Sequence, residues 1–213
     1  MCPKTPLLVA AALAALAAGP AQAQLNAVKL GFTSYQPDSR TSGIQGIGVP
    51  AGADARVGSA TTTVFIYERM LSSNLGAELV LGVPPRVKAR ATGSVAFLGD
   101  DVLSAKNVAP TVFLNYHFGT PSSTFRPYVG LGVNYTRFEG ARSKLAPKVE
   151  MSDSTGLAIV GGVNYAFNKQ WSVFASAAKV ETKSNLVATG STVLTTTIDF
   201  RPTVYTLGTA YKF

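Results

Sequence analysis

The sequence predicts an all-β protein, an eight-stranded antiparallel up-and-down transmembrane β-barrel with short periplasmic turns and longer outer loops. Three observations predict this fold. Bulky apolar residues recur at every second position in eight segments, which is the period of a β-strand. Short and long connections alternate along the chain. The strand aromatics gather beside the short connections and the C-terminus.

Composition excludes several other classes of protein. The chain has 213 residues, of which 46% are hydrophobic and 14% charged, so it is too apolar to be disordered. A single Cys excludes a disulfide framework or a thiolate metal cluster, and a single His excludes a His-pair metal site. No apolar run of about 18 residues follows the N-terminal region, which excludes a helical membrane protein. We therefore expect no cofactor.

Residues 1–23 are predicted to be a cleaved signal peptide, and residues 24–213 the barrel. Lys4 precedes an apolar run over residues 7–18, and the segment 21–23 reads Ala-Gln-Ala, the small-x-small pattern of a cleavage site. The apolar run is too short to span a bilayer. Export and the barrel pattern together predict location in the cell outer membrane.

The first four predicted strands each alternate bulky with small or polar residues. In the first, Val28, Leu30 and Phe32 are separated by Lys29 and smaller residues. In the fourth, the face opposite the bulky set carries Phe113, Asn115 and His117 as well as Thr111. The four segments span residues 27–35, 60–71, 75–83 and 108–118.

The last four predicted strands repeat the pattern. The fifth is the clearest, because Val129, Leu131 and Val133 alternate with two glycines and Asn134. The eighth ends the chain at Phe213. The fifth, sixth and seventh segments span residues 125–138, 154–167 and 171–184.

The connections and the two strand faces indicate a membrane barrel. The connections over 72–74, 119–124 and 168–170 are short, and those after the odd-numbered strands are longer, so long connections all fall at one end. A soluble barrel buries its bulky residues, whereas the small and polar face here suits the narrow interior of eight strands. The bulky face is therefore predicted to meet lipid.

Eight residues on the small and polar face are predicted to line the lumen. A buried carboxylate is costly unless paired, so Glu78 is expected to pair with a cation on that face or with Arg126. Such a pair could constrict the lumen or be a plain interior salt bridge. His117 is expected to be a structural, hydrogen-bonded residue near the periplasmic mouth. The lumen candidates are Lys29, Glu78, Phe113, Asn115, His117, Asn134, Phe174 and Lys212.

Nine aromatic residues of the bulky face are predicted to form a girdle at one membrane–water interface. All lie within a few residues of a short turn or of the C-terminus, so threading the strands up and down brings them to one height. They are Tyr67, Tyr116, Phe118, Phe125, Tyr165, Phe167, Trp171, Tyr211 and Phe213.

Segments along most of the mature chain resemble the OmpW family of small outer-membrane barrels. They are Val28-Lys29-Leu30-Gly31, Leu75-Gly76-Ala77-Glu78-Leu79, Ala109-Pro110-Thr111, Asn115-Tyr116-His117-Phe118, the run over residues 126–135 and the closing run over 208–213. The resemblance implies a narrow, rather apolar lumen that passes small hydrophobic molecules, with release sideways through the wall as one option. It also implies that the terminal Phe213 is read by the outer-membrane assembly machinery. The first two outer loops, rich in Gly, Ala and Pro, depart from the family pattern.

The formal net charge of +8 indicates either an anionic partner or a set of cations exposed to water on the loops. Nucleic acid is not an expected partner, because the protein is predicted to be exported and its sequence has no concentrated basic stripe. Contact with lipopolysaccharide phosphates is one interpretation and a hydrated loop surface the other. The cations concerned are Arg40, Arg56, Arg86, Lys88, Arg90, Arg142, Lys144 and Lys148.

Three functions stay open at this point. The favoured one is an outer-membrane barrel giving passive passage to small, mainly hydrophobic solutes, because Phe113, Phe174, Val160 and Val180 make the predicted lumen partly apolar. A sealed structural or receptor barrel acting through its outer loops is the alternative. A lipid-modifying enzyme is not expected, since no Ser lies near His117 to serve as its nucleophile.

Overall fold

The computed structural model describes residues 25–190 and 193–213. The predicted signal peptide lies outside the described residues. Within them no helix is long and apolar enough to cross a membrane.

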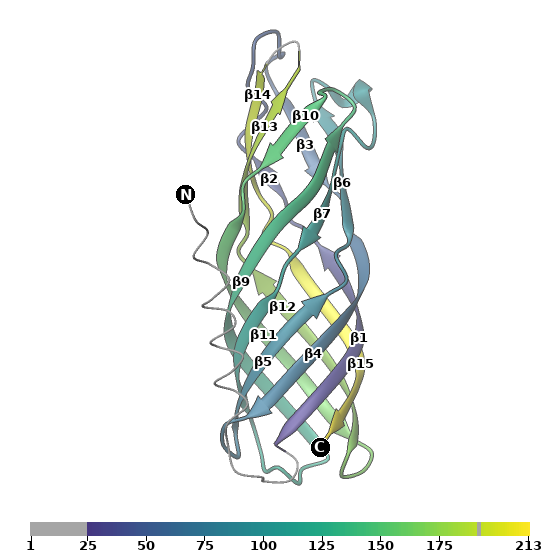
Figure 1. The fold of residues 1–213 in the computed structure, drawn as a ribbon, viewed down its shortest axis with the longest axis vertical. Helices are drawn as coiled ribbons and strands as arrows, with labels where there is room; N and C mark the ends of the chain where they lie inside the picture. The colour runs from purple at the N-terminus through teal and green to yellow at the C-terminus, as the bar shows by residue number, and fades with distance from the viewer. Residues whose placement is uncertain (1–24, 191–192) are drawn as a thin grey trace.

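Eight strands close into the predicted antiparallel barrel (Figure 1). Each pairs with the next one along the chain, and the last pairs with the first through a register that joins Ala27 to Lys212 and Gln36 to Thr203. The barrel strands are β1 (Asn26–Gln36), β4 (Ala60–Met70), β5 (Leu75–Gly82), β8 (Thr111–His117), β9 (Phe125–Ser143), β11 (Ser154–Ala166), β12 (Trp171–Val180) and β15 (Thr203–Lys212).

The long connections contain further strands where the sequence predicts loops. Three of them continue the barrel wall upward beside the long strand β9, and four form a second small sheet (Figure 1). The wall extension consists of β3 (Ala53–Val57), β6 (Arg86–Gly93) and β7 (Leu103–Val108), with a short 3₁₀ helix, η1 (Ala96–Leu98). The second sheet consists of β2 (Arg40–Thr41), β10 (Lys148–Met151), β13 (Lys183–Thr189) and β14 (Val193–Asp199). We call the wall extension, the second sheet and the part of β9 beside them the upper extension.

Three strand ends differ from those that the sequence predicts. The seventh segment, predicted to run to residue 184, ends at Val180, and β13 begins at Lys183 with the same alternation, which hid the break. The fourth begins at Thr111 because Pro110 has no N–H to donate to a ladder. The fifth continues to Ser143, since it pairs with β7 above the eight-stranded part.

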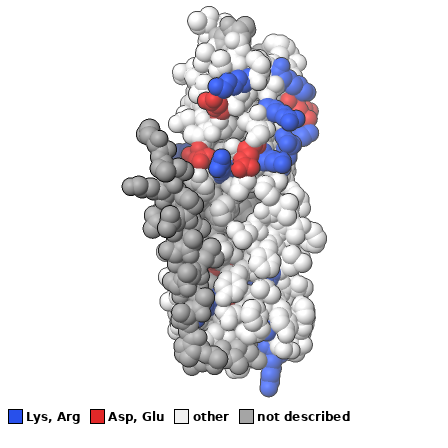
Figure 2. Space-filling view, in the orientation of Figure 1, with Lys and Arg blue, Asp and Glu red and all other residues white. Residues whose placement is uncertain are grey.

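Large apolar side chains cover the outside of the eight-stranded part. Leu131 is 69% exposed, and Phe32 is 70% exposed between the buried Gly31 and Thr33. An ordinary water-soluble barrel has the opposite arrangement. Figure 2 shows the same contrast, since charged side chains gather over the upper extension and are almost absent from the visible lower wall.

A charged cluster and an apolar interior within the barrel

A charged cluster fills the barrel interior towards the end with the short turns. The Nζ atom of Lys29 lies 2.6 Å from a carboxylate oxygen of Glu78 and 2.9 Å from one of Glu68. The Nε2 atom of His117 lies 2.6 Å from the other oxygen of Glu68. All four side chains are buried.

The strand registers explain why these four residues meet. Glu68 on β4 lies directly opposite Glu78 on β5, so two carboxylates face each other on neighbouring strands. Lys29 enters from β1, on the other side of β4. A lysine ammonium with several donors can bridge both carboxylates, which keeps either from being a buried, unpaired charge.

Polar and aromatic side chains complete the cluster. The amide of Asn115 lies 3.5 Å from Glu68, and Asn115 has no exposed surface. The Lys29 ammonium lies 5.3 Å from the centre of the Tyr128 ring and 5.4 Å from that of Phe174, distances suited to cation–π attraction.

The structure brings four of the eight lumen candidates into this cluster: Lys29, Glu78, Asn115 and His117. Phe174 borders it, and Phe113 packs further along the interior with Tyr128 and Val160. Asn134 lies apart, with its amide donating to the Thr111 hydroxyl at 2.8 Å. Lys212 is half-buried at the mouth of the barrel.

Glu68 in the cluster and Tyr128 beside it are not among the candidates that the sequence predicts. Glu68 follows the outward aromatic Tyr67, so its inward direction was readable from the period of two. Tyr128 is 2% exposed and lies next to Pro127, which obscures the pattern there. Arg126, a candidate partner for Glu78, instead donates a hydrogen bond to the Ser73 carbonyl.

The interior changes character above the cluster. In the upper extension most buried residues are apolar, although Asn107 and Ser184 are buried there too, and the rings of Phe138 and Phe200 stack with centroids 5.1 Å apart. The members of this upper apolar interior are Tyr35, Val57, Val87, Ala89, Ala105, Phe138, Ala146, Leu186, Ala188, Ile198 and Phe200.

The barrel wall is weakly joined at one point between these two levels. The pairing of β5 with β8 ends at Val80 and Thr111, and that of β6 with β7 begins at Arg86 and Lys106. Three prolines lie in this interval and have no N–H to donate: Pro84, Pro85 and Pro110. The Asn107 amide donates a hydrogen bond to the Pro85 carbonyl at the upper end of this interval. We call residues 81–84 and 108–110 the wall gap.

Cations gather on the outer face of the upper extension (Figure 2). Arg56 lies opposite Arg90 between β3 and β6, and Arg86 lies opposite Lys106 between β6 and β7. Like charges directly opposite each other destabilise a sheet. This outer basic surface consists of Arg56, Arg86, Lys88, Arg90, Lys106, Arg137 and Arg142, all exposed.

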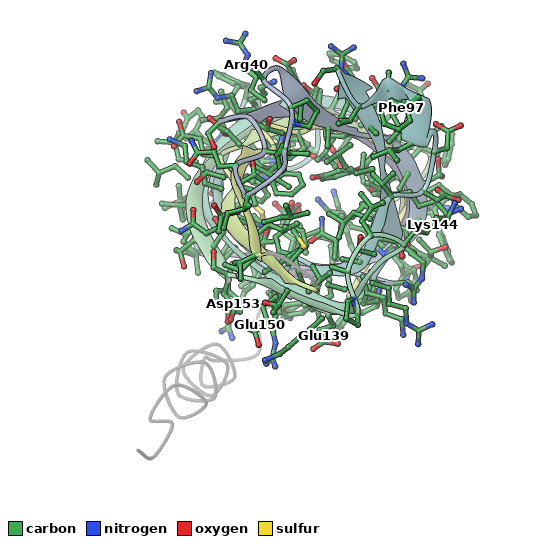
Figure 3. All side chains as sticks on the ribbon, turned by 90° about the horizontal axis from the view of Figure 1, so that it is seen from above. Arg40, Phe97, Glu139, Lys144, Glu150 and Asp153 are labelled. Carbon is green, nitrogen blue, oxygen red and sulfur yellow. The ribbon has the colours of Figure 1, made fainter. Side chains whose placement is uncertain are left out.

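The remaining loop cations lie elsewhere on the rim. Arg40 is in β2, and Lys148 pairs with Glu150 at 2.8 Å. Seen along the barrel axis, Lys144 and the acidic residues Glu139, Glu150 and Asp153 lie on the outside of the rim (Figure 3).

The nine predicted girdle aromatics lie on the outer side of the barrel strands or just beyond them. Seven are exposed by about half or more, and Tyr67 and Tyr211 are partly buried. Several contact each other: the rings of Trp171 and Tyr211 lie 5.0 Å apart, and those of Tyr116 and Phe118 lie 5.3 Å apart. Tyr67 donates a hydrogen bond to Asn26.

No group of three metal-ligating side chains occurs within residues 25–190 and 193–213.

Comparisons with known proteins agree on one family. A family model described as the OmpW family matches residues 24–213. Outer membrane protein W of Vibrio cholerae serotype O1 is 30% identical over 95% of this chain and 96% of that protein. The crystal structure of the outer membrane protein OprG from Pseudomonas aeruginosa matches with a TM-score of 0.81 and 28% identity, over 90% of this chain and 97% of that one. The dibenzothiophene metabolism operon protein PahQ of Pseudomonas aeruginosa is 28% identical over 74% of this chain and 73% of that protein.

Proposed function

The chain belongs to the OmpW family of outer-membrane proteins, and from this premise we propose that it gives small, mainly hydrophobic solutes a passive route through the narrow interior of its barrel. The protein is an outer-membrane β-barrel, with its short turns on the periplasmic side and its upper extension outside the cell. We propose no catalytic step for it.

The upper apolar interior is the observation that carries this proposal. It lies in the part of the barrel that stands above the lipid-facing wall, where a solute arrives from outside. Buried Val, Ile, Leu and Phe side chains attract apolar solutes and offer no hydrogen bonds to sugars or ions. The name of the relative PahQ, which refers to dibenzothiophene metabolism, supports an aromatic hydrophobic solute.

The charged cluster makes a straight path to the periplasm unfavourable for such a solute. Passing it would separate Lys29 from Glu68 and Glu78 in a place where an unpaired charge is costly. The wall gap lies above the cluster, and its residue Val83 is 63% exposed on the outside. We propose that solutes leave sideways through the wall gap into the membrane.

Uptake into liposomes tests the proposal. Protein reconstituted in phosphatidylcholine vesicles should speed entry of naphthalene and leave entry of glucose unchanged. Ala89→Gln adds a larger polar group to the upper apolar interior and should lower naphthalene entry several-fold. Lys88→Gln, on the opposite face of the same strand, is the matched control and should not.

A sealed structural or receptor barrel is the second candidate. The burial of the charged side chains of the cluster inside the barrel favours it. Naphthalene entry no faster than in protein-free vesicles would select this candidate and reject passage.

We propose two partners on the same footing. Lipopolysaccharide phosphates suit the outer basic surface, because it lies just above the lipid-facing wall and contains cations that face each other across strands, such as Arg56 and Arg90. Phe213, half-exposed at the end of the closing strand, is proposed as the residue that the assembly machinery reads.

A further inference from the structure

A cavity of about 1000 Å³ opens at the periplasmic end of the barrel. Its floor is the charged cluster, through Lys29, Glu68 and His117. Arg126 and Lys212 line its sides. This periplasmic cavity lies below the cluster, whereas the proposed solute route stays above it.

The charges that line the cavity are not balanced. Lys29 is held by two carboxylates, and Glu68 is shared between Lys29 and His117. The other charged side chains lining it are Arg126, Lys169 and Lys212. Among the residues that the structure describes, none of these three cations has a carboxylate within 4.0 Å, the C-terminal carboxylate included. The cavity therefore favours an anion.

Three buried polar atoms on its lining lack a hydrogen-bond partner within the described chain. They are Nε of Arg126, Oγ of Ser172 and Nδ1 of His117. Their side chains are no more than 6% exposed. Because Arg126 is anchored to the Ser73 carbonyl through Nη2, its Nε is left as a fixed donor. A buried donor without a partner is costly, and an oxyanion bound beside Arg126 can accept from Nε once the side chains that cover this atom shift.

The cavity also has an apolar side. Leu25, Met70, Leu71, Ala166 and Phe167 contribute to its lining. We propose that the periplasmic cavity binds the oxyanion head of a small amphiphile, a carboxylate or phosphate group on an apolar tail. The head accepts hydrogen bonds beside Arg126 and Lys212, and the tail covers the apolar side chains.

Four probes with a shared design test this proposal. The barrel in phosphatidylcholine nanodiscs is titrated with hexanoate, hexyl phosphate, hexanol and inorganic phosphate, and the backbone amide signals of Ser172 and Lys212 are followed by NMR. Hexanoate and hexyl phosphate should both shift these signals saturably, and the tighter of the two identifies the head group. Saturable shifts with hexanol as strong as with hexanoate, or with phosphate as strong as with hexyl phosphate, would overturn the proposal.

Variants then assign the site. Lys212→Gln should weaken hexanoate binding by about tenfold, which corresponds to about 1.4 kcal/mol. Arg126→Lys keeps the charge but removes Nε and should also weaken it. Lys179→Gln, an exposed residue of β12 outside the cavity, is the control and should leave the affinity unchanged. Heat-modifiable migration on gels shows whether each variant has folded. Equal affinity in the folded Lys212→Gln and Lys179→Gln proteins would refute the assignment.

Discussion

Lys29 holds together two carboxylates that the fold forces to face each other. Glu68 and Glu78 occupy opposite positions on neighbouring strands, where like charges repel. Both are buried, so water screens them poorly. The ammonium at 2.6 and 2.9 Å offsets that repulsion, which makes the pairing conditional on one side chain.

Lys29→Met should therefore destabilise the barrel strongly. Removing one partner of a buried ionic group typically costs about 3–5 kcal/mol, because the remaining charge is left uncompensated. Urea unfolding in lipid vesicles measures the change in free energy. Lys88→Met removes an exposed pair with Asp101 and should cost less than about 1 kcal/mol. Similar losses for the two variants would contradict the role given to Lys29.

Glu78→Gln addresses the two meanings that the pair could have. The proposed solute route leaves the barrel above the cluster, so this variant should leave naphthalene entry into vesicles unchanged, whereas faster entry would mean that the cluster constricts the lumen. Unchanged entry, with the variant still folded, would leave a plain interior salt bridge.

The sequence predicts which face a residue occupies better than which residue it meets. Period two directed Glu78 inward, and the need for a cation followed from burial, but Lys29, Lys212, His117 and Arg126 all remained possible partners. The choice depends on strand register around a closed barrel. A register shift of two residues keeps a side chain on the same face but moves it to another height in the barrel. The alternation in the sequence therefore does not show which of the four cations lies level with Glu78.

At the scale of elements, the closing pair β1 and β15 depends on two opposed glycines. Gly31 lies opposite Gly208, and the Phe174 ring covers both from the interior. A Cβ atom built on Gly208 would lie 2.2 Å from the Leu30 carbonyl oxygen and 2.8 Å from the Phe174 ring. The close approach of strand and ring therefore requires glycine at this position.

Gly208→Ala should destabilise the closed barrel. Overfilling a packed interior typically costs about 1–3 kcal/mol through displaced backbone and side chains. Gly161→Ala on β11 is the matched control, because a Cβ atom there meets nothing within 4 Å. Unfolding midpoints of the two variants in the same detergent provide the comparison. A Gly208→Ala protein as stable as Gly161→Ala would disprove the packing argument.

The barrel strands were predictable as elements, and the upper strands were not. Residues 125–138 alternate because one face meets lipid and the other the narrow interior, two environments that differ sharply. The strand β14 carries three consecutive threonines, Thr195 to Thr197, which suit either face and give no period. Its place was set by pairing with β13, a contact that the sequence does not display.

At the scale of the whole molecule, the apolar outer surface of the barrel is the feature that requires a membrane around it. Leu131 lies in the middle of the lipid-facing part of β9, opposite Leu114 and Ile159 on its neighbours. Leu131→Arg should lower stability in vesicles by about 2–4 kcal/mol, the usual cost of Arg near the bilayer centre. Phe97→Arg adds the same charge on the exposed helix η1 and should cost little. Equal effects in vesicles would mean that the apolar surface does not face lipid.

The cations of the outer basic surface affect the stability of the barrel in two opposite ways. They repel one another within the sheet, and in our proposal they attract the phosphates of lipopolysaccharide. Without lipopolysaccharide, replacing both Arg56 and Arg90 by Gln removes a like-charge pair and should leave the barrel as stable or more stable. With lipopolysaccharide, each lost cation should weaken attraction to the anionic surface by about 1 kcal/mol. The double variant should therefore gain less stability on adding lipopolysaccharide than the natural protein gains, and the gain should shrink with salt.

The control is Lys148→Gln, whose charge is paired with Glu150 at the rim. An identical gain for the double variant, or equal binding to anionic and neutral lipids, would remove lipopolysaccharide as the partner of this surface.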